Sequence, residues 1–177
     1  MGWFFSKEEK KEEKEEENQK ENQKKQNLLD CKDCIFKIKK YKKNLEENAT
    51  QKKENAKESL KAENKDRAKM NLRIEKMYRM QIEIAKNELD TLEEQYNQIE
   101  KNQSQEEASN VLKQGNEILE KLQNEVNVDK FKEIPEDIDE LNEINEEISK
   151  FFKAHDIKDE EDVNNELDKL IESVQKD

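Results

Sequence analysis

The sequence predicts an all-α protein in which a long antiparallel helical hairpin precedes three shorter acidic helices. The first observation is composition: the 177 residues include two Gly and one Pro, and 45% are charged while 31% are hydrophobic. Such a chain lacks the apolar material for a thick globular core but can form long helices with narrow apolar seams. The second observation is periodicity, because apolar residues recur at steps of three and four, as on one face of a helix.

The amphipathic part of the first helix is predicted to begin at Leu28. It follows a tract without apolar residues (7–27), which is expected to be a frayed helix or a solvated spacer. The apolar seam then runs through Cys31, Cys34, Ile38, Tyr41, Leu45 and Ala49. We expect both cysteines to be buried seam residues rather than a redox or zinc site. A zinc ion would need two more ligands, and the single histidine, His155, is distant in sequence.

The second helix is predicted to follow a chain reversal at 58–65, because the apolar seam becomes sparse between 52 and 65. Asp66 suits its N-cap, since a carboxylate can accept hydrogen bonds from the free backbone N–H groups of the first turn. From Tyr78 to Ile99 apolar residues recur in steps of four and three. This seven-residue repeat is typical of a helix that packs along another helix.

Polar residues at 102–107 interrupt this pattern, and Gly115 precedes the next apolar run. Because Gly inside a helix costs about 1 kcal/mol relative to Ala, we expect a hinge at Gly115. Three short helices are predicted after it, with Asp129 as a candidate cap, Pro135 early in the middle helix, and a loop at 154–158. Isolated helices shorter than about 12–15 residues are marginal in water, so each must dock on the hairpin or on another molecule.

Charge is sorted along the chain, with 17 Lys and Arg against 9 Asp and Glu in 32–86, and 9 against 23 in 102–177. Such arms can attract each other or different partners, which predicts a switch with an anionic surface as the competitor. The first helix carries six lysines outside its seam: Lys32, Lys37, Lys39, Lys40, Lys42 and Lys43. They are either a solvated face or anionic-lipid contacts, which are worth about 1 kcal/mol each near a negative membrane.

The first six residues, MGWFFS, are the most hydrophobic end of this polar chain. Met-Gly-x-x-x-Ser fits the N-myristoylation pattern, so Gly2 is the predicted lipidation site. Trp3, Phe4 and Phe5 could insert into the membrane interface themselves, and a disordered start is the alternative. We therefore divide the chain into an N-terminal membrane anchor and polar linker (1–27), a basic helical hairpin (28–112) and acidic regulatory helices (113–177).

Several classes of function are not expected. The sequence has no Gly-rich phosphate loop and no nucleophile elbow, so we predict neither an enzyme nor a catalytic residue, cofactor or metal ion. The basic arm lacks interleaved aromatic residues, which argues against a nucleic-acid partner. No apolar run approaches the roughly 18 residues needed to span a bilayer, and no signal peptide is evident. The simplest expectation is a cytoplasmic protein.

The layout resembles the ESCRT-III family of membrane-remodelling subunits, and most of all the charged multivesicular body protein 6 (vacuolar protein sorting 20) type. The resemblance rests on NKDRAKMNLRIEKMY (64–78), KQGNEILEKLQNE (113–125) and DIDELNEINEEIS (137–149). It implies a closed form in which the acidic helices cover the basic hairpin, and an open form that polymerises on anionic endosomal membrane. It also implies other ESCRT-III subunits as partners, with ESCRT-II engaging 28–45.

The same resemblance implies a protein peripheral on the endosome membrane that nucleates filaments for budding and scission in multivesicular body sorting. An ATPase with a microtubule-interacting and trafficking (MIT) domain would dismantle the filament. Leu167, Leu170 and Val174 form a possible helical motif for that domain, although the last helix could equally cap the closed hairpin alone. The alternative function is a plain coiled-coil tether in which the charge sorting is incidental.

Overall fold

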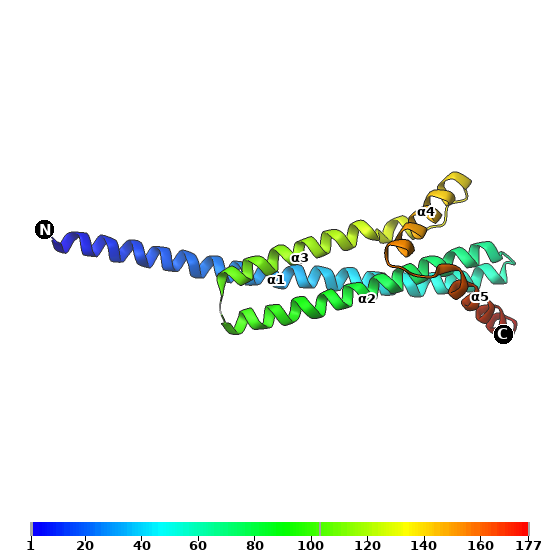
Figure 1. The fold of residues 1–177 in the computed structure, drawn as a ribbon, viewed down its shortest axis with the longest axis horizontal. Coiled ribbons are helices and arrows are strands. Elements are labelled where there is room, and N and C mark those ends of the chain that lie inside the picture. The colour runs from blue at the N-terminus through cyan, green and yellow to red at the C-terminus, as the bar shows by residue number, and fades with distance from the viewer. Residues whose placement is uncertain (1, 103, 177) are drawn as a thin grey trace. The chain divides into compact units, whose positions relative to one another are not determined.

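The computed structural model describes residues 2–102 and 104–176, with the side chains of residues 2–6, 105 and 159–160 left undescribed. Five α-helices and one 3-10 helix follow one another along this part of the chain (Figure 1). They are α1 (Gly2–Lys61), α2 (Lys65–Asn102), α3 (Gln105–Glu125), η1 (Val128–Phe131), α4 (Ile138–Ala154) and α5 (Asp159–Lys176). The described residues contain no strand and the chain is 90% helical, which confirms the all-α prediction.

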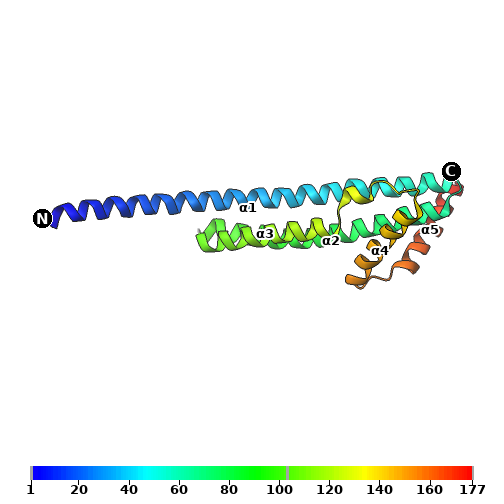
Figure 2. The same cartoon turned by 90° about the horizontal axis from the view of Figure 1, so that it is seen from above.

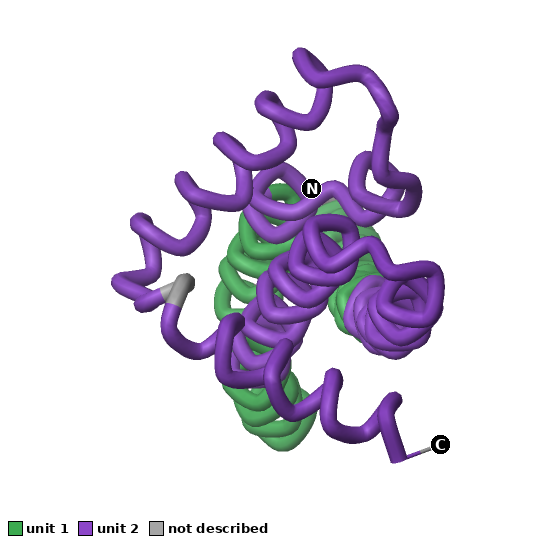
Figure 3. Tube along the Cα trace, turned by 90° about the vertical axis from the view of Figure 1, so that its right-hand side faces the viewer, with its two compact units in different colours: residues 1–39, 88–120 green, residues 40–87, 121–177 purple. Residues whose placement is uncertain are grey.

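The chain divides into two compact units, and the boundary between them passes through α1, α2 and α3 (Figure 3). Unit 1 comprises residues 1–39 and 88–120, and unit 2 comprises residues 40–87 and 121–177. Each unit therefore combines pieces of the three long helices, and only unit 2 includes α4 and α5.

Unit 1 has a narrow core that includes the two cysteines. Cys31 and Cys34 are buried, free thiols, as their seam positions predict. The Cys31 thiol donates a hydrogen bond to the backbone oxygen of Ala108 in α3, with 3.3 Å between sulfur and oxygen. Burial, with a smaller contribution from Cys34, raises the pKa of Cys31 to about 11, so this thiol is a packing group and not a nucleophile at neutral pH. The polar tract at 7–26 is helical and almost entirely exposed.

The predicted hinge at Gly115 is not a bend in the structure, because α3 continues through this residue. A Cβ atom at Gly115 would lie 2.9 Å from the Cys34 sulfur and 3.9 Å from Leu92 Cδ1. The glycine is therefore explained by the close approach of α1 to α3, which a side chain would prevent. The interruption of the helices lies instead between Asn102 and Gln105, inside the polar stretch 102–107.

The hairpin turn of unit 2 falls where the sparse seam predicts it, between Lys61 and Lys65. Its cap is Asn64, whose side-chain oxygen accepts a hydrogen bond from the backbone N–H of Arg67 at 3.1 Å. The prediction of Asp66 as the N-cap is wrong, because Asp66 already belongs to the first turn of α2. There its negative charge still suits the positive end of the helix dipole.

Two predictions about the connection between α3 and α4 are also wrong. Asp129 does not cap a helix; it lies inside η1, whose N-cap is Asn127. Pro135 precedes α4 instead of lying within it. The cap of α4 is Asp137, whose side chain accepts hydrogen bonds from the backbone N–H groups of Asp139 (2.8 Å) and Glu140 (3.4 Å), and this cap fixes the start of the helix at Ile138.

A candidate regulatory interface in unit 2

The acidic helices α4 and α5 lie at the turn end of the α1–α2 hairpin (Figures 1 and 2). A small apolar cluster attaches α5: Val163 and Leu170 of α5 are buried together with Ala56 of α1 and Leu72 of α2. The partly buried Leu60 and Leu167 pack against the same cluster. The apolar face of α5 is therefore covered by the hairpin, as expected for a short helix that needs a dock.

Two basic side chains of α2 attach the acidic helices by polar contacts. The Arg73 guanidinium donates hydrogen bonds to the side chains of Asn145 (2.5 Å) and Ser149 (3.2 Å) in α4. The Lys76 ammonium donates to the backbone oxygen of Lys158 and to the carboxylate of Asp162, both at 3.0 Å. The same ammonium lies 5.7 Å from the centre of the Phe152 ring, within cation–π range.

A buried hydrogen-bonded group holds the C-terminal end of α3 and the start of η1; we call Tyr41, Tyr78 and Gln81 the carbonyl clasp. The Tyr41 hydroxyl lies 3.0 Å from the backbone oxygen of Leu122 and 2.7 Å from that of Val126. Tyr78 donates to the oxygen of Val128 at 3.1 Å, and Gln81 donates to that of Leu122 at 3.0 Å. The carbonyl of Leu122 also accepts from the backbone N–H of Val126 at 3.1 Å. The clasp gives the carbonyls of Val126 and Val128, which follow the end of α3, hydrogen-bond donors from the hairpin.

Burial raises the pKa of Tyr41 to about 12 and raises that of Tyr78 further. Both hydroxyls are therefore neutral donors at physiological pH. Sequence analysis assigned the tyrosines to the packing seam and did not find this role. The one available signal was the hydroxyl itself, since a buried Tyr normally finds a hydrogen-bond partner.

The buried carboxyl of Glu75 on α2 is unfavourable for the docked state. The residue is 5% exposed, and burial raises the pKa of its carboxyl. It forms an ion pair with Arg79, at 3.5 Å between nitrogen and oxygen. The Arg79 and Lys53 charges oppose the shift, whereas the Glu166 charge on α5 adds to it. The negative charge of an ionised Glu75 is thus only partly offset by nearby cations, and it is repelled by Glu166 of the docked α5.

Glu75→Gln is expected to stabilise the protein by about 1 kcal/mol at neutral pH, because it removes a buried charge and keeps the shape. A carboxyl whose pKa is raised on folding stabilises the folded state most below the unfolded-state pKa, and this contribution is lost as pH rises through the folded-state pKa. Thermal melts of both proteins across the acidic to neutral range should therefore converge at low pH. Glu83→Gln, the same change at an exposed site of α2, is the control; equal effects of the two would contradict this account.

The six lysines of α1 are divided between the units. In unit 1, Lys37 pairs with Asp33 (3.2 Å) and Lys39 pairs with Glu93 (2.8 Å), while Lys32 is exposed. In unit 2, Lys42 is half-buried and pairs with Glu46 (3.2 Å), while Lys40 and Lys43 are exposed. Exposed ion pairs of this kind are worth little, so the five exposed ammonium groups remain available to an external anion. Their contact with lipid stays a prediction.

The N-terminal predictions lie outside the described side chains. Gly2, Trp3, Phe4 and Phe5 form the backbone start of α1, and lipidation and membrane insertion there stay predictions.

Sequence analysis did not single out two other hydrophobic residues of unit 1. Leu29 and Phe36 are 61% and 63% exposed, and they lie seven residues apart, hence on one face of α1.

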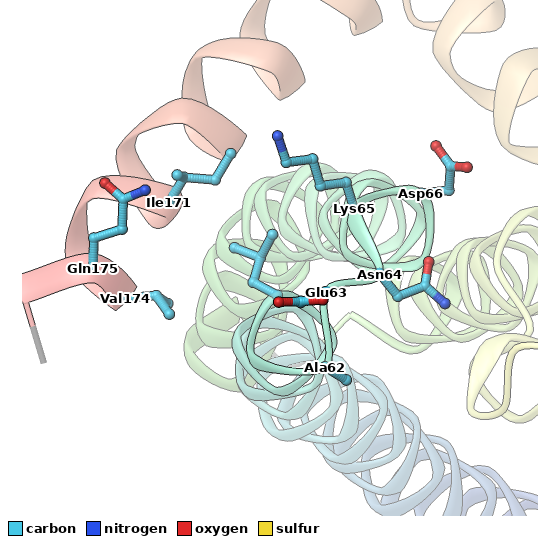
Figure 4. A pocket seen from close by; sticks show the side chains of 9 residues that line it. Ala62, Glu63, Asn64, Lys65, Asp66, Ile171, Val174 and Gln175 are labelled. Carbon is cyan, nitrogen blue, oxygen red and sulfur yellow. The ribbon is translucent and has the colours of Figure 1, made fainter.

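The predicted ATPase-binding residues are engaged within the chain. Leu170 is buried, and Leu167 and Val174 are half-buried. Val174 also lines a cavity of about 770 Å³ between the hairpin turn and the end of α5, together with Ile171 (Figure 4). Binding of another protein to this face of α5 would first require α5 to leave the hairpin.

Within residues 2–102 and 104–176, no group of three or more His, Cys, Asp or Glu side chains could hold a metal ion. None of the helices in that part of the chain is long and apolar enough to cross a membrane.

The all-α hairpin with acidic helices docked near its turn is consistent with the fold of the ESCRT-III class. The Snf7 family model matches residues 26–177, and the chain belongs to the Snf7 family. Proteins of this family are structural membrane-remodelling scaffolds that associate peripherally with membranes, and an ESCRT-III-type membrane-remodelling role follows for this chain. Comparison with the curated proteins and with the solved structures gave no match.

Proposed function

We propose that the chain is an ESCRT-III subunit of the charged multivesicular body protein 6 type. In this role it attaches to anionic endosomal membrane by its N-terminus, is engaged by ESCRT-II, and nucleates filaments of other ESCRT-III subunits. These filaments drive budding and scission in multivesicular body sorting. Residues 1–27 serve as anchor and linker, 28–112 as the membrane-facing hairpin, and 113–177 as the regulatory part.

The observation that carries this proposal is the way the acidic helices are held on the hairpin. Arg73 and Lys76 of α2 are occupied by groups of α4 and α5. Anionic lipid competes for cations of this kind, and a negative surface attracts each nearby Lys or Arg by about 1 kcal/mol. With a docking cluster as small as that of α5, a membrane that engages several cations at once can offset the docking energy.

Membrane attachment begins with residues 1–6 in this proposal. A single myristoyl chain on Gly2 gives only marginal attachment, with an association constant of about 10⁴ M⁻¹. Trp3, Phe4 and Phe5 add interfacial affinity, the lysines at 32–43 add electrostatic attraction, and assembly into a filament multiplies both. The exposed Leu29 and Phe36 support the assignment of 28–45 as the ESCRT-II-binding region, because they offer an apolar contact that the described residues leave uncovered.

Deletion of residues 2–6 tests the anchor. We expect the shortened protein to lose most of its binding to liposomes that contain anionic lipid, measured by co-flotation, while its circular dichroism changes little because the deletion shortens a 60-residue helix by five residues. Gly2→Ala separates lipidation from aromatic insertion when the protein is produced with an N-myristoyltransferase. Undiminished flotation of the shortened protein would contradict the anchor.

The alternative of a coiled-coil tether predicts a stable, salt-insensitive dimer. The proposed closed form instead predicts a compact monomer that loosens as salt rises, since charges separated by more than about 10 Å are screened at 0.1 M. Sedimentation velocity at low and moderate salt distinguishes the two, and a dimer of constant shape would favour the tether.

A further inference from the structure

A polar cavity of about 520 Å³ lies in unit 2, beside the hairpin turn. Its walls come from the end of α1, the start of α2 and the connection between η1 and α4. This volume is in the range of small-molecule sites, typically about 300–1,000 Å³. The residues that matter to the argument are Lys52, Ser59, Arg67, Asn71, Lys132 and Glu133.

Two cations in this cavity lack an anionic partner. Lys52 is 2% exposed, and its ammonium donates one hydrogen bond, to the backbone oxygen of Lys132 at 2.9 Å. An ammonium has three donors, so two remain unused. The exposed guanidinium of Arg67 makes no ion pair or hydrogen bond within the described part of the chain. Buried charge without a partner is unfavourable and marks a place where an anion can bind.

The electrostatics of Lys52 agree with this geometry. Burial, and next the charge of Arg67, lower the pKa of its ammonium to about 8, while Glu133 acts in the opposite direction. The effect of Arg67 means that the two cations are close enough to repel each other. The contact of Lys52 with Lys132 is to an uncharged backbone oxygen. The ammonium of Lys132 itself pairs with Asp129 at 3.0 Å. An anion placed between Lys52 and Arg67 would offset both the cost of burying the Lys52 charge and the repulsion between the two cations.

A buried acceptor in the same wall lacks a donor. Asn71 is 2% exposed, and its amide nitrogen donates to the Ser59 hydroxyl (3.4 Å) and to the Arg67 backbone oxygen (3.1 Å). Its side-chain oxygen has no hydrogen-bond partner. An unpaired buried acceptor costs free energy that a hydroxyl donor would recover. The cavity thus combines unpaired cations with an unpaired acceptor.

We propose that this cavity binds a phosphate monoester carried on a polyhydroxylated molecule, with the phosphate on Lys52 and Arg67 and a hydroxyl on Asn71. Such a ligand is either a soluble polyol phosphate or the phosphorylated headgroup of an inositol lipid. Because the cavity joins the hairpin to the connection that leads into α4, the bound ligand stabilises the docked arrangement of the acidic helices. This inference goes beyond the proposed function and does not depend on membrane attachment.

Calorimetric titration of the full chain with inositol 1,4,5-trisphosphate tests the proposal. We expect saturable one-to-one binding that Arg67→Gln weakens about tenfold or more, as for loss of a charge-assisted hydrogen bond. Lys57→Gln is the matched control, since Lys57 pairs with Glu54 on α1 and does not line the cavity. Absence of saturable binding, or an equal loss in Lys57→Gln, would overturn the proposal.

Two further measurements define the ligand. Inorganic phosphate should bind more weakly than the trisphosphate, and equal affinity would overturn the role given to Asn71. Proton uptake on binding near pH 8 should be detectable in buffers of different ionisation enthalpy, because the anion raises the pKa of Lys52. Arg67→Gln should reduce this uptake, and uptake that is absent from the native protein would contradict the placement of the phosphate.

The source of the phosphate is decided with vesicles. Flotation with neutral phosphatidylcholine vesicles, with and without a phosphorylated inositol lipid, is compared between the native chain and Arg67→Gln. Retention that requires both the inositol lipid and Arg67 identifies a lipid headgroup as the ligand. Calorimetric binding without such retention identifies a soluble ligand. Both outcomes support the site, whereas failure of the N-terminal deletion test affects only the proposed function.

Discussion

Leu170→Asp is expected to release α5 from the hairpin and to increase binding to anionic liposomes. Leu170 is 6% exposed and belongs to the apolar cluster that joins α5 to α1 and α2. Replacing it removes apolar contacts and places a charge in that cluster, which should cost about 2–4 kcal/mol of docking energy. A cost of this size shifts the equilibrium between docked and released α5 by about 30-fold or more.

Amide hydrogen exchange and liposome co-flotation measure the two parts of this result. Exchange should become fast along 159–176 and stay slow in the parts of α1 and α2 that lie away from the α5 cluster. Asn165→Asp adds the same charge to an exposed position of the same helix and should leave both readouts near those of the native protein. If α5 were released without any increase in flotation, the docked helix would not control membrane binding.

Release of α5 also bears on the proposed ATPase motif. Leu167, Leu170 and Val174 cannot be offered to a partner while they pack on the hairpin. Engagement of the hairpin by the membrane and ATPase recruitment are therefore coupled in this proposal, because both require the same helix to leave. The coupling is reciprocal, so a ligand that favours the docked state opposes both events.

The helical architecture could be predicted because it depends on local patterns. Steps of three and four located the seam that buries Cys31 and Cys34, and the sparse seam located the hairpin turn. Caps were predicted less well, because neighbouring Asn and Asp residues compete for the same role within a few positions. Asn64 caps α2 where Asp66 was expected, and only the backbone course decides between them.

The parts of the interface that sequence analysis missed depend on contacts between distant residues. Gly115 was interpreted from its helix propensity, whereas the close approach of Cys34, 81 positions earlier, explains it. The partners of the clasp are equally remote, since the Tyr41 hydroxyl meets backbone oxygens 81 and 85 positions away. A periodicity argument finds which residues share a face but cannot identify the partner of a buried hydroxyl.

The double variant Tyr41→Phe, Tyr78→Phe is expected to loosen the start of the acidic arm while leaving the helices intact. Each change keeps the ring in the core and removes one hydroxyl. The carbonyls of Val126 and Val128 are then left without their donors, at about 1–3 kcal/mol for each buried unsatisfied group. The chain should unfold at lower denaturant concentration, and amide exchange should rise first at 122–131.

Tyr96→Phe is the matched control, because the Tyr96 hydroxyl makes no hydrogen bond within residues 2–102 and 104–176. Its removal should change stability by much less than either clasp substitution.

The clasp and the α5 cluster act on successive parts of one arm, so the double variant combined with Leu170→Asp should bind anionic liposomes more tightly than Leu170→Asp alone. Equal binding by the two would show that release of α5 is sufficient and that the clasp contributes to folding stability without controlling the exposure of the hairpin.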